Sequence, residues 1–397
     1  YALNGSIDQV RIFSSALAPG DVEDLYNEHF PTKFTDGSDT ALKFTGGTGD
    51  ITFADTAPVF TPGDNFNTVI YTGNRVNAST TNPQTVGFQP DFTWQKIRTQ
   101  GYSNMLLDSI RGGDNALSSN TTASDTNGTT NNFGGIDFVP NGVVINSSAY
   151  AVDILNKSGD DMVIWNWKAG GAARNNTDGS IASLVSANTA AGFSIVSYTG
   201  NGTVGATIGH GLGVKPELFF IKELSATRDW IAWCNEDNTK LGYLNYTDAF
   251  DSSRYSWALN STQPTSTTIT FSNDAATNGS GNYIAYCWRS IAGYSKIGSY
   301  TGNGSATGPI ITTGFEPAWV MVKRTDNTSA WNIQDNKRNT TNPRTSVLQA
   351  SSSDQEYTSS TYAINFNTND FQIVNSDNGW NTSGGTYIYM AFATNPT

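Results

Sequence analysis

The sequence predicts an all-β fold, built from tandem antiparallel β-sandwich modules of jelly-roll type. Short runs of β-branched and aromatic residues alternate with turns rich in Asn, Gly, Ser and Thr, and helical periodicity is rare. The chain has 397 residues, which is more than one hydrophobic core usually organises. The third observation is internal repetition, which predicts three copies of one sandwich unit.

Each copy of the repeat carries the same motifs in the same order. An aromatic-Thr-Gly-Asn turn is followed, after seventeen to nineteen residues, by the proline of a Gly-apolar-x-Pro motif, and a lysine comes six residues after that proline. Such regular order and spacing indicate a repeated structural unit. The turns begin at Tyr71, Tyr198 and Tyr300, the prolines are Pro90, Pro216 and Pro317, and the lysines are Lys96, Lys222 and Lys323.

An aromatic-ended strand closes each copy, and we expect it to be buried on both faces. Every second position is large and apolar, and the alternate positions are nearly as apolar, which is typical of a covered central strand. Cys287 takes an alternate position that Asn166 and Ala391 hold in the sister copies, so we expect a buried free thiol there. The closing strands are 162–167, 283–288 and 387–392.

These patterns divide the chain into six parts. Residues 168–179 are rich in glycine and small polar residues and predict a flexible or crossover linker. The second and third copies meet at 291–293 almost without a linker, so they should dock closely. The predicted parts are 1–30, a closing strand and helix; 31–64, a connecting segment; 65–170, the first sandwich; 171–190, a linker; 191–290, the second sandwich; and 291–397, the third.

Two aspartates are predicted to pair with lysines of the repeat. Asp108 and Asp335 each follow their lysine by twelve residues and precede an arginine by three. Asn235, thirteen residues after its lysine, is expected to take this place in the second copy. We therefore expect lysine and aspartate to pair across neighbouring strands in the first and third copies.

The first thirty residues follow a different pattern. Residues 5–13 alternate as a strand, and 19–28 predict a short helix with proline in its first turn and acidic residues near its start. This segment resembles the closing strand and terminal helix of a laminin-G-like, concanavalin-type jelly roll. One strand and two helical turns bury too little apolar surface to fold alone, so we expect them to complete a sheet supplied by upstream sequence or another subunit.

Residues 65–397 resemble structural proteins of tailed bacteriophages of the marine and cyanobacterial type. The stretches that carry the resemblance are 87–94, 108–112, 165–171 and 191–200. It implies a virion component, a tail fibre or a capsid appendage, exposed on the particle surface and oligomeric. Its expected partners are other virion proteins, copies of itself and a host surface glycan.

Two other functions stay open. A glycan-binding adhesin or filament subunit, secreted or on a cell surface, would also use repeated β-sandwiches. A polysaccharide-degrading tailspike is disfavoured, because glutamate is scarce and the strand-borne carboxylate pair of jelly-roll glucanases is missing from the sequence. We therefore expect a non-enzymatic attachment protein.

Charge and composition argue against further partners. The chain has 22 Lys and Arg against 34 Asp and Glu, a formal net charge of −12, whereas a nucleic-acid-binding protein needs a basic face. No run reaches the eighteen apolar residues of a membrane helix, so no membrane insertion is expected. Cys234 and Cys287 are too few for a disulfide scaffold.

The sequence predicts no catalytic, cofactor-binding or metal-binding residues, and it does not identify a ligand site. His210 lies between glycines and His29 ends the short helix, and neither belongs to a recognisable triad or metal motif. The acidic turns at 36–39 and 158–161 could offer oxygen ligands to calcium but lack EF-hand spacing.

Tryptophans outside the closing strands are the remaining candidates for a ligand site, because an indole ring can stack on a sugar. The alternative is that they fill the cores of three separate sandwiches and contacts between subunits. These tryptophans are Trp230, Trp233, Trp257, Trp331 and Trp380.

Overall fold

A computed structural model of the chain describes residues 41–43, 52–54, 61–77, 79–127, 134–147 and 154–393. It separates two units, 1–60 and 61–397. In the first unit, strands β1 (Ala41–Lys43) and β2 (Thr52–Ala54) form an antiparallel pair. The predicted strand and helix of residues 1–30, His29 and the acidic turn at 36–39 lie outside the described residues. In the second unit, nearly all regular structure is antiparallel β-sheet, so the predicted all-β fold class is confirmed.

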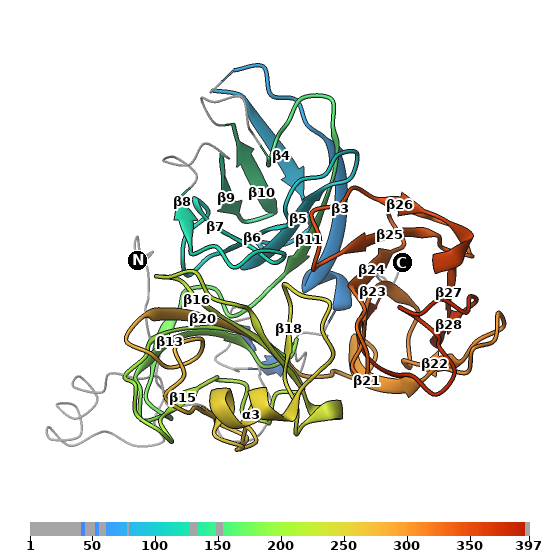
Figure 1. The fold of residues 1–397 in the computed structure, drawn as a ribbon. Helices are drawn as coiled ribbons and strands as arrows, with labels where there is room; N and C mark the ends of the chain where they lie inside the picture. The colour runs from blue at the N-terminus through green and yellow to red at the C-terminus, as the bar shows by residue number, and fades with distance from the viewer. Residues whose placement is uncertain are drawn as a thin grey trace, which may run out of the picture. The chain divides into compact units, whose positions relative to one another are not determined.

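The second unit contains three large sheets with a common order of strands (Figure 1). We call residues 61–170, 171–290 and 291–393 the first, second and third segments. The large sheet of the first segment has β3 (Phe66–Thr72), β11 (Asp161–Trp167), β5 (Phe92–Ile97), β6 (Met105–Asp108), β7 (Asn115–Ser118) and β8 (Thr126–Asn127), in that order. That of the third has β21 (Ser295–Thr301), β29 (Thr386–Ala393), β23 (Pro317–Arg324), β24 (Trp331–Asp335), β25 (Ser346–Gln349) and β26 (Tyr357–Thr358).

The large sheet of the second segment has seven strands, with two additional strands at one edge and one strand fewer at the other. Its order is β12 (Arg174–Asn176), β13 (Ser183–Asn188), β14 (Phe193–Thr199), β20 (Asn282–Trp288), β16 (Leu218–Glu223), β17 (Ile231–Cys234) and β18 (Gly242–Tyr243). Residues 171–190, predicted as a linker, therefore contain β12 and β13, which extend this sheet through six register pairs between β13 and β14. The glycine-rich stretch is used as part of the fold.

Each large sheet is covered by a smaller one, and their facing side chains form a core. The first segment adds β4 (Thr81–Thr85), β10 (Gly142–Asn146) and β9 (Gly135–Val139); the second adds β15 (Thr207–Gly209) and β19 (Thr268–Thr270); the third adds β22 (Ile310–Thr312), β28 (Asp370–Ile373) and β27 (Ile364–Asn367). The second segment also has helix α3 (Ser252–Leu259), the one α-helix in the described residues. Short 3-10 turns are η1 (Pro62–Asp64), η2 (Asn235–Asp237) and η3 (Ser360–Tyr362).

The closing strands β11, β20 and β29 are buried on both faces, as predicted. One face points into the sandwich: Tyr283, Ala285 and Cys287 belong to the core of the second segment. The other face meets the neighbouring segments in a central aromatic cluster. Its members are Phe66, Phe92, Trp94, Trp165, Trp167, Phe193, Tyr286, Trp288, Trp319 and Phe392.

Trp167 shows how this cluster joins all three segments. Its ring centroid lies 6.4 Å from that of Trp288 in the second segment and 5.6 Å from those of Trp319 and Phe392 in the third. Edge-to-face aromatic pairs of this kind add about 0.5–1.5 kcal/mol each beyond the buried area. The tryptophans thus fill one shared centre as well as separate sandwich cores.

The segments dock through three junctions of one kind. Each places the β5–β6, β16–β17 or β23–β24 hairpin of one segment against the last residue of a strand of another segment, β25, β7 or β18 respectively. A side-chain N–H at the same hairpin position donates to a backbone carbonyl across each junction. The bonds are Asn104 Nδ2 to Gln349 O, 3.1 Å, from the first segment to the third; Trp331 Nε1 to Tyr243 O, 2.9 Å, from the third to the second; and Trp230 Nε1 to Ser118 O, 2.9 Å, from the second to the first. The contacts therefore close a ring.

Candidate functional site

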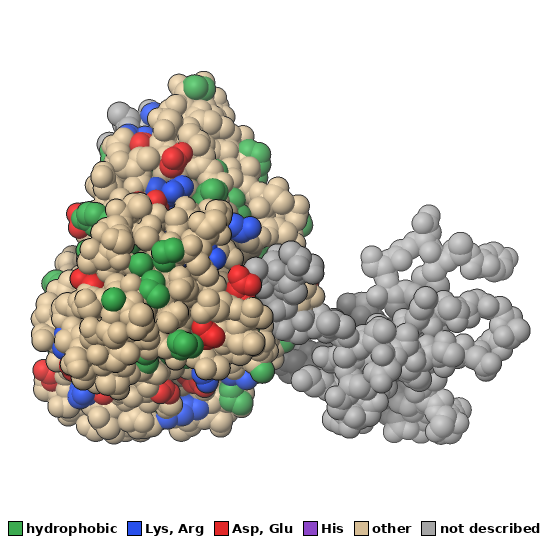
Figure 2. All heavy atoms as spheres, turned by 90° about the vertical axis from the view of Figure 1, so that its right-hand side faces the viewer, with side chains coloured by type: hydrophobic (Ala, Val, Ile, Leu, Met, Phe, Trp, Pro, Cys, Tyr) green, Lys and Arg blue, Asp and Glu red, His purple; other side chains and the backbone are tan. Residues whose placement is uncertain are grey.

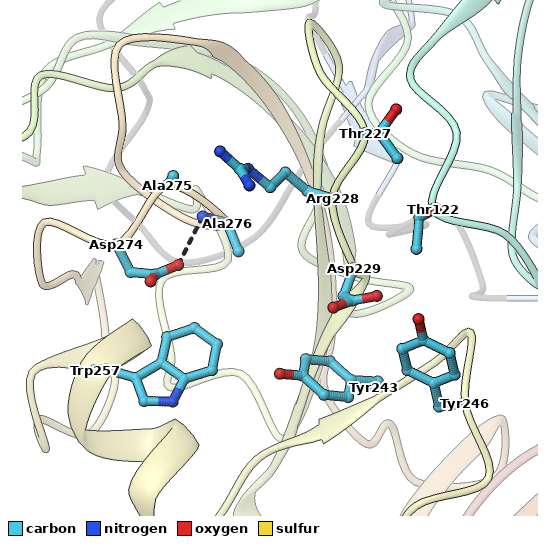
Figure 3. Close-up of a pocket in the computed structure, with 10 residues that line it drawn as sticks. All are labelled: Thr122, Thr227, Arg228, Asp229, Tyr243, Tyr246, Trp257, Asp274, Ala275 and Ala276. Carbon is cyan, nitrogen blue, oxygen red and sulfur yellow. Dashed lines mark hydrogen bonds between the residues drawn. The ribbon is translucent and has the colours of Figure 1, made fainter.

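A pocket of about 300 Å³ beside α3 brings aromatic rings and carboxylates together. In the view of Figure 3, the rings of three aromatic residues stand in a row, with Asp274 near the first and Asp229 near the other two. The side chains that define this pocket, hereafter the α3 pocket, are Arg228, Asp229, Tyr243, Tyr246, Trp257 and Asp274. Thr122 of the first segment also lines it, so the site lies at the junction of the first and second segments.

Helix α3 presents Trp257 to the pocket. The helix starts where the Asp251 side chain accepts a hydrogen bond from Ser253 N, 2.6 Å, and ends where Asn260 adopts the left-handed conformation with φ 52°. Tyr255, Ala258 and Leu259 are buried on its inner face. Trp257 packs only partly against the core, which leaves its indole half-buried at the pocket wall.

The loop that carries Asp229 is tied to the loop that carries Tyr246. Asn245 Nδ2 donates to Asp229 Oδ1 at 2.9 Å, while Asn245 Oδ1 accepts from Trp230 N at 2.9 Å. Arg228 N donates to Thr122 O at 3.0 Å, which fixes this loop against the first segment. These bonds hold Asp229 and Tyr246 on one side of the pocket, and the negative charge of Asp229 raises the pKa of the Tyr246 hydroxyl.

Asp274 stands in a turn between β19 and β20. Its Oδ1 accepts from Ala276 N at 2.7 Å, and its carbonyl accepts from Thr277 N and Asn278 N. Burial raises the pKa of the Asp274 carboxyl, because desolvation disfavours the charged form. The turn therefore places a partly desolvated carboxylate at the pocket wall.

Tyr243 and Tyr246 form the other aromatic wall. Their rings meet edge to face at 5.6 Å, and the Arg254 guanidinium lies 4.3 Å from the Tyr243 ring centroid. Tyr246 is 43% exposed. The pocket thus joins apolar ring faces to charged hydrogen-bonding groups, the combination that small-molecule sites use.

Of the five tryptophans considered as ligand platforms, the structure leaves one accessible. Trp257 lines the α3 pocket, while the other four are buried. Trp230 and Trp331 bond across junctions, as described above, and Trp233 and Trp380 belong to the cores of the second and third segments. Sequence reasoning did not find Asp229, Asp274, Tyr243 or Tyr246 as pocket residues, because no motif links these three loop positions and the last residue of β18.

The predicted lysine–aspartate pairs are wrong. Lys96 Nζ donates to the carbonyls of Ile97 and Ser353, at 3.0 and 3.1 Å, and Asp108 instead pairs with Arg111, 2.6 Å between Nε and Oδ2. The third segment repeats this arrangement: Asp335 pairs with Arg338 at 2.5 Å. A backbone turn explains the pairing, since Asp108 Oδ1 accepts from Ile110 N and Arg111 N and brings the arginine back over the carboxylate.

The other candidates take structural positions. His210 is buried, its Nδ1 accepts from Leu212 N at 3.2 Å, and burial lowers its pKa. The Asp160 carboxylate accepts from Lys157, Thr99 and Gln100. Cys234 and Cys287 are both buried and free, which confirms the expected free thiol at Cys287.

The described residues contain neither a metal-ligand cluster nor a membrane-spanning helix. No three His, Cys, Asp or Glu side chains within this part of the chain gather closely enough to hold a metal ion. None of its helices is long and apolar enough to cross a membrane. On the face drawn in Figure 2, acidic and basic side chains stand scattered among neutral ones.

Comparison with known proteins gives one match. Residues 61–396 match a family described as Domain of unknown function (DUF7483). No curated protein and no solved structure matches the chain. The match spans most of the sequence, and the chain therefore belongs to the DUF7483 family.

Proposed function

We propose that this chain is a non-enzymatic structural protein of a tailed-phage virion, in a tail fibre or capsid appendage, and that it attaches the particle to a glycan on the host surface. The sequence resemblance over residues 65–397 supports the virion role. The observation that carries the attachment role is the α3 pocket, which the half-buried indole of Trp257 lines together with two tyrosines and two carboxylates, Asp274 on its own side and Asp229 on the tyrosine side (Figure 3). A flat ring stacks on the apolar face of a sugar, and carboxylates accept hydrogen bonds from its hydroxyls.

The ring of junctions supports attachment in a second way. Docked sandwiches with a shared aromatic centre form a rigid base for a loop-built pocket. Repeated chains in an oligomer would multiply a weak site into avid attachment. An extracellular adhesin of a cell would use the same pocket, and the genomic neighbours of the full-length gene distinguish the two.

The test measures binding of purified protein to host cells and to their isolated surface polysaccharide. Trp257→Ala should lower binding at least about tenfold, a loss of about 1.4 kcal/mol. Tyr357→Ala is the matched control, because Tyr357 is an exposed aromatic residue of β26 outside the pocket. Equal binding by both variants and the wild type would refute attachment through this pocket.

The same samples test the non-enzymatic part of the proposal. Polysaccharide chain length should stay unchanged after long incubation with the protein. Asp274 has a raised pKa and faces a pocket that also holds Asp229, an arrangement that glycosidases use for acid catalysis. Depolymerisation that Asp274→Asn or Asp229→Asn abolishes would replace attachment with a tailspike hydrolase.

A further inference from the structure

The charges around the α3 pocket are unbalanced. Asp229 and Asp274 line it together with a single cationic side chain, Arg228. The Arg228 guanidinium lies 3.4 Å from Glu223, outside the pocket lining, and is 49% exposed. Arg228 therefore shares its positive charge with a third carboxylate, and the pocket keeps a net negative charge.

The two pocket carboxylates have neutral partners. Asp229 accepts from the side-chain amide of Asn245, and Asp274 accepts from the backbone of Ala276. Within the described residues, neither carboxylate lies within 4 Å of a lysine or arginine nitrogen. A carboxylate has room for several hydrogen bonds, so both can accept more from a ligand.

The aromatic wall also favours a positive ligand. The faces of Trp and Tyr rings carry partial negative charge and attract cations. Tyr243 already shows the effect, since the Arg254 guanidinium, which pairs with Asp248 and is not a lining residue, lies over its ring at 4.3 Å. The half-buried ring of Trp257 stands on the Asp274 side in the view of Figure 3.

We propose that the α3 pocket binds a sugar that carries a protonated amino group. The sugar ring stacks on Trp257, and the ammonium group lies between the carboxylates of Asp229 and Asp274. This inference rests on the proposed attachment function and adds the chemical class of the glycan. The volume of about 300 Å³ is at the lower end for small-molecule sites, which suits one sugar residue.

The experiment compares two probes that differ at one nitrogen, which is a protonated amine in one probe and a neutral acetamide in the other. Short oligomers of glucosamine and of N-acetylglucosamine, equal in length, are titrated into the protein by calorimetry at pH 6. We expect the glucosamine oligomer to bind at least tenfold more tightly, and more weakly as NaCl rises from 50 to 500 mM. Equal affinities, or a preference for the acetylated oligomer, would refute the inference.

Three variants identify the charged side chains of the pocket that bind the ammonium group. Asp229→Asn and Asp274→Asn should each weaken glucosamine binding at least tenfold and weaken N-acetylglucosamine binding much less, because the amide oxygen of Asn still accepts hydrogen bonds from hydroxyls. Arg228→Gln tests the sign of the effect, since it removes a positive charge from the pocket lining and should strengthen glucosamine binding. Unfolding midpoints of all variants show whether they fold. A loss of glucosamine binding in Arg228→Gln alone, with both aspartate variants unaffected, would overturn the assignment.

The outcomes separate this inference from the function on which it rests. Binding of host polysaccharide that depends on Trp257, without preference for the amino sugar, refutes the amino-group inference and leaves attachment standing. Failure of both oligomers and of host polysaccharide to bind refutes both.

Discussion

Two of the three junctions between segments contain a buried carboxylate, and the third has sulfur-containing residues at the corresponding positions. Asp108 accepts from Tyr286 of the second segment at 2.7 Å, and Asp335 accepts from Trp165 of the first at 3.0 Å. The register of the paired strands identifies the residue of the second segment that is equivalent to Asp108 and Asp335. Phe92 pairs with Asp108, Trp319 with Asp335, and Leu218 with Cys234, so Cys234 takes the aspartate position. The assignment of Asn235 to this position was wrong by one residue.

The residue type at the equivalent position of each closing strand matches the residue type, aspartate or cysteine, of the neighbouring segment. Trp165, Tyr286 and Met390 pair with Trp94, Phe220 and Met321, each two residues before the lysine of its segment, and so are equivalent. An N–H or O–H donor is present where the neighbour has aspartate, and a thioether where it has cysteine. In this molecule, a buried carboxylate therefore occurs only at the junctions where the neighbouring segment supplies a hydrogen-bond donor. The physical reason is that an unpaired buried charge destabilises a protein by roughly 3–5 kcal/mol.

The largest effect is expected for a substitution that removes the buried carboxylate from one junction. Asp335→Ala removes the closest carboxylate from the buried Arg338 guanidinium, which keeps Glu356 and the Ile333 carbonyl, and it removes the acceptor of Trp165 Nε1. We expect the free energy of unfolding in urea to fall by about 3–5 kcal/mol. Cys234→Ala, the matched change at the sulfur junction, should cost about 1 kcal/mol, near the value of one buried methylene. Equal losses would contradict the comparison.

The second prediction concerns a substitution that removes a hydrogen-bond donor and keeps the shape of the side chain. Tyr286→Phe deletes the hydroxyl that donates to Asp108 and should lower the free energy of unfolding by about 1.5–3 kcal/mol, the value of a hydrogen bond to a charged group. Met390→Leu conserves volume at the equivalent position and should cost less than about 1.5 kcal/mol. A larger loss in the methionine variant than in the tyrosine variant would show that packing outweighs the hydrogen bond.

The third prediction concerns a feature that all three segments share, a buried lysine. Lys323 Nζ donates to Thr247 O at 3.0 Å and Ser329 O at 2.6 Å, and burial lowers its pKa to about 7. The charged groups around it are Asp248, Arg254, Arg324 and Asp326. Between pH 7 and 10 the unfolded chain binds more protons at this lysine than the folded chain, so the stability that it contributes rises with pH.

Lys323→Met should remove that rise, which is at most about 1.4 kcal/mol per pH unit. Urea unfolding of the variant and the wild type at pH 6, 7, 8 and 9 measures the difference. Lys96→Met is the matched control at a carboxylate junction, and its difference should begin to grow near pH 8, where burial places the Lys96 pKa. A pH-independent difference for both variants would show that the folded lysines keep their ordinary pKa.

Much of the strand framework follows from the sequence, and the pairing of charges does not. The closing strands were predictable because apolar side chains occupy both sets of alternate positions, and only a covered strand accommodates that pattern. The prediction of lysine–aspartate pairs was wrong because it took only cross-strand neighbours into account. The turn after Asp108 brings Arg111 closer, and the lysine reaches carbonyls of another segment, which local spacing does not reveal.

The candidate site was predictable only in part. Trp257 was one of five tryptophans, and nothing in its sequence neighbourhood separates it from Trp230 or Trp331, which bond across junctions. The distinction arises from the docking of segments, which buries two of these rings and leaves the third at a pocket. Asp229 lies in the β16–β17 hairpin loop and Asp274 lies in the connection from β19 to β20, which belong to different sheets, so no periodicity connects the two residues.

The smallest expected effect concerns the arginine position of the sulfur junction. Arg338 follows Asp335 by three residues and is fully buried, whereas Asp237 follows Cys234 by three and pairs with Lys240 at 3.2 Å, with the lysine side chain 40% exposed. An exposed pair gains little, because water screens it and two long side chains lose freedom. Asp237→Asn should therefore lower the free energy of unfolding by less than about 1 kcal/mol, and 1 M NaCl should abolish the loss. The loss in Asp335→Ala should persist in 1 M NaCl, because buried pairs are screened far less. Unfolding of both variants at low and high salt tests whether the two kinds of junction differ in electrostatics as well as in composition. A salt-resistant loss above about 2 kcal/mol in Asp237→Asn would show that they do not.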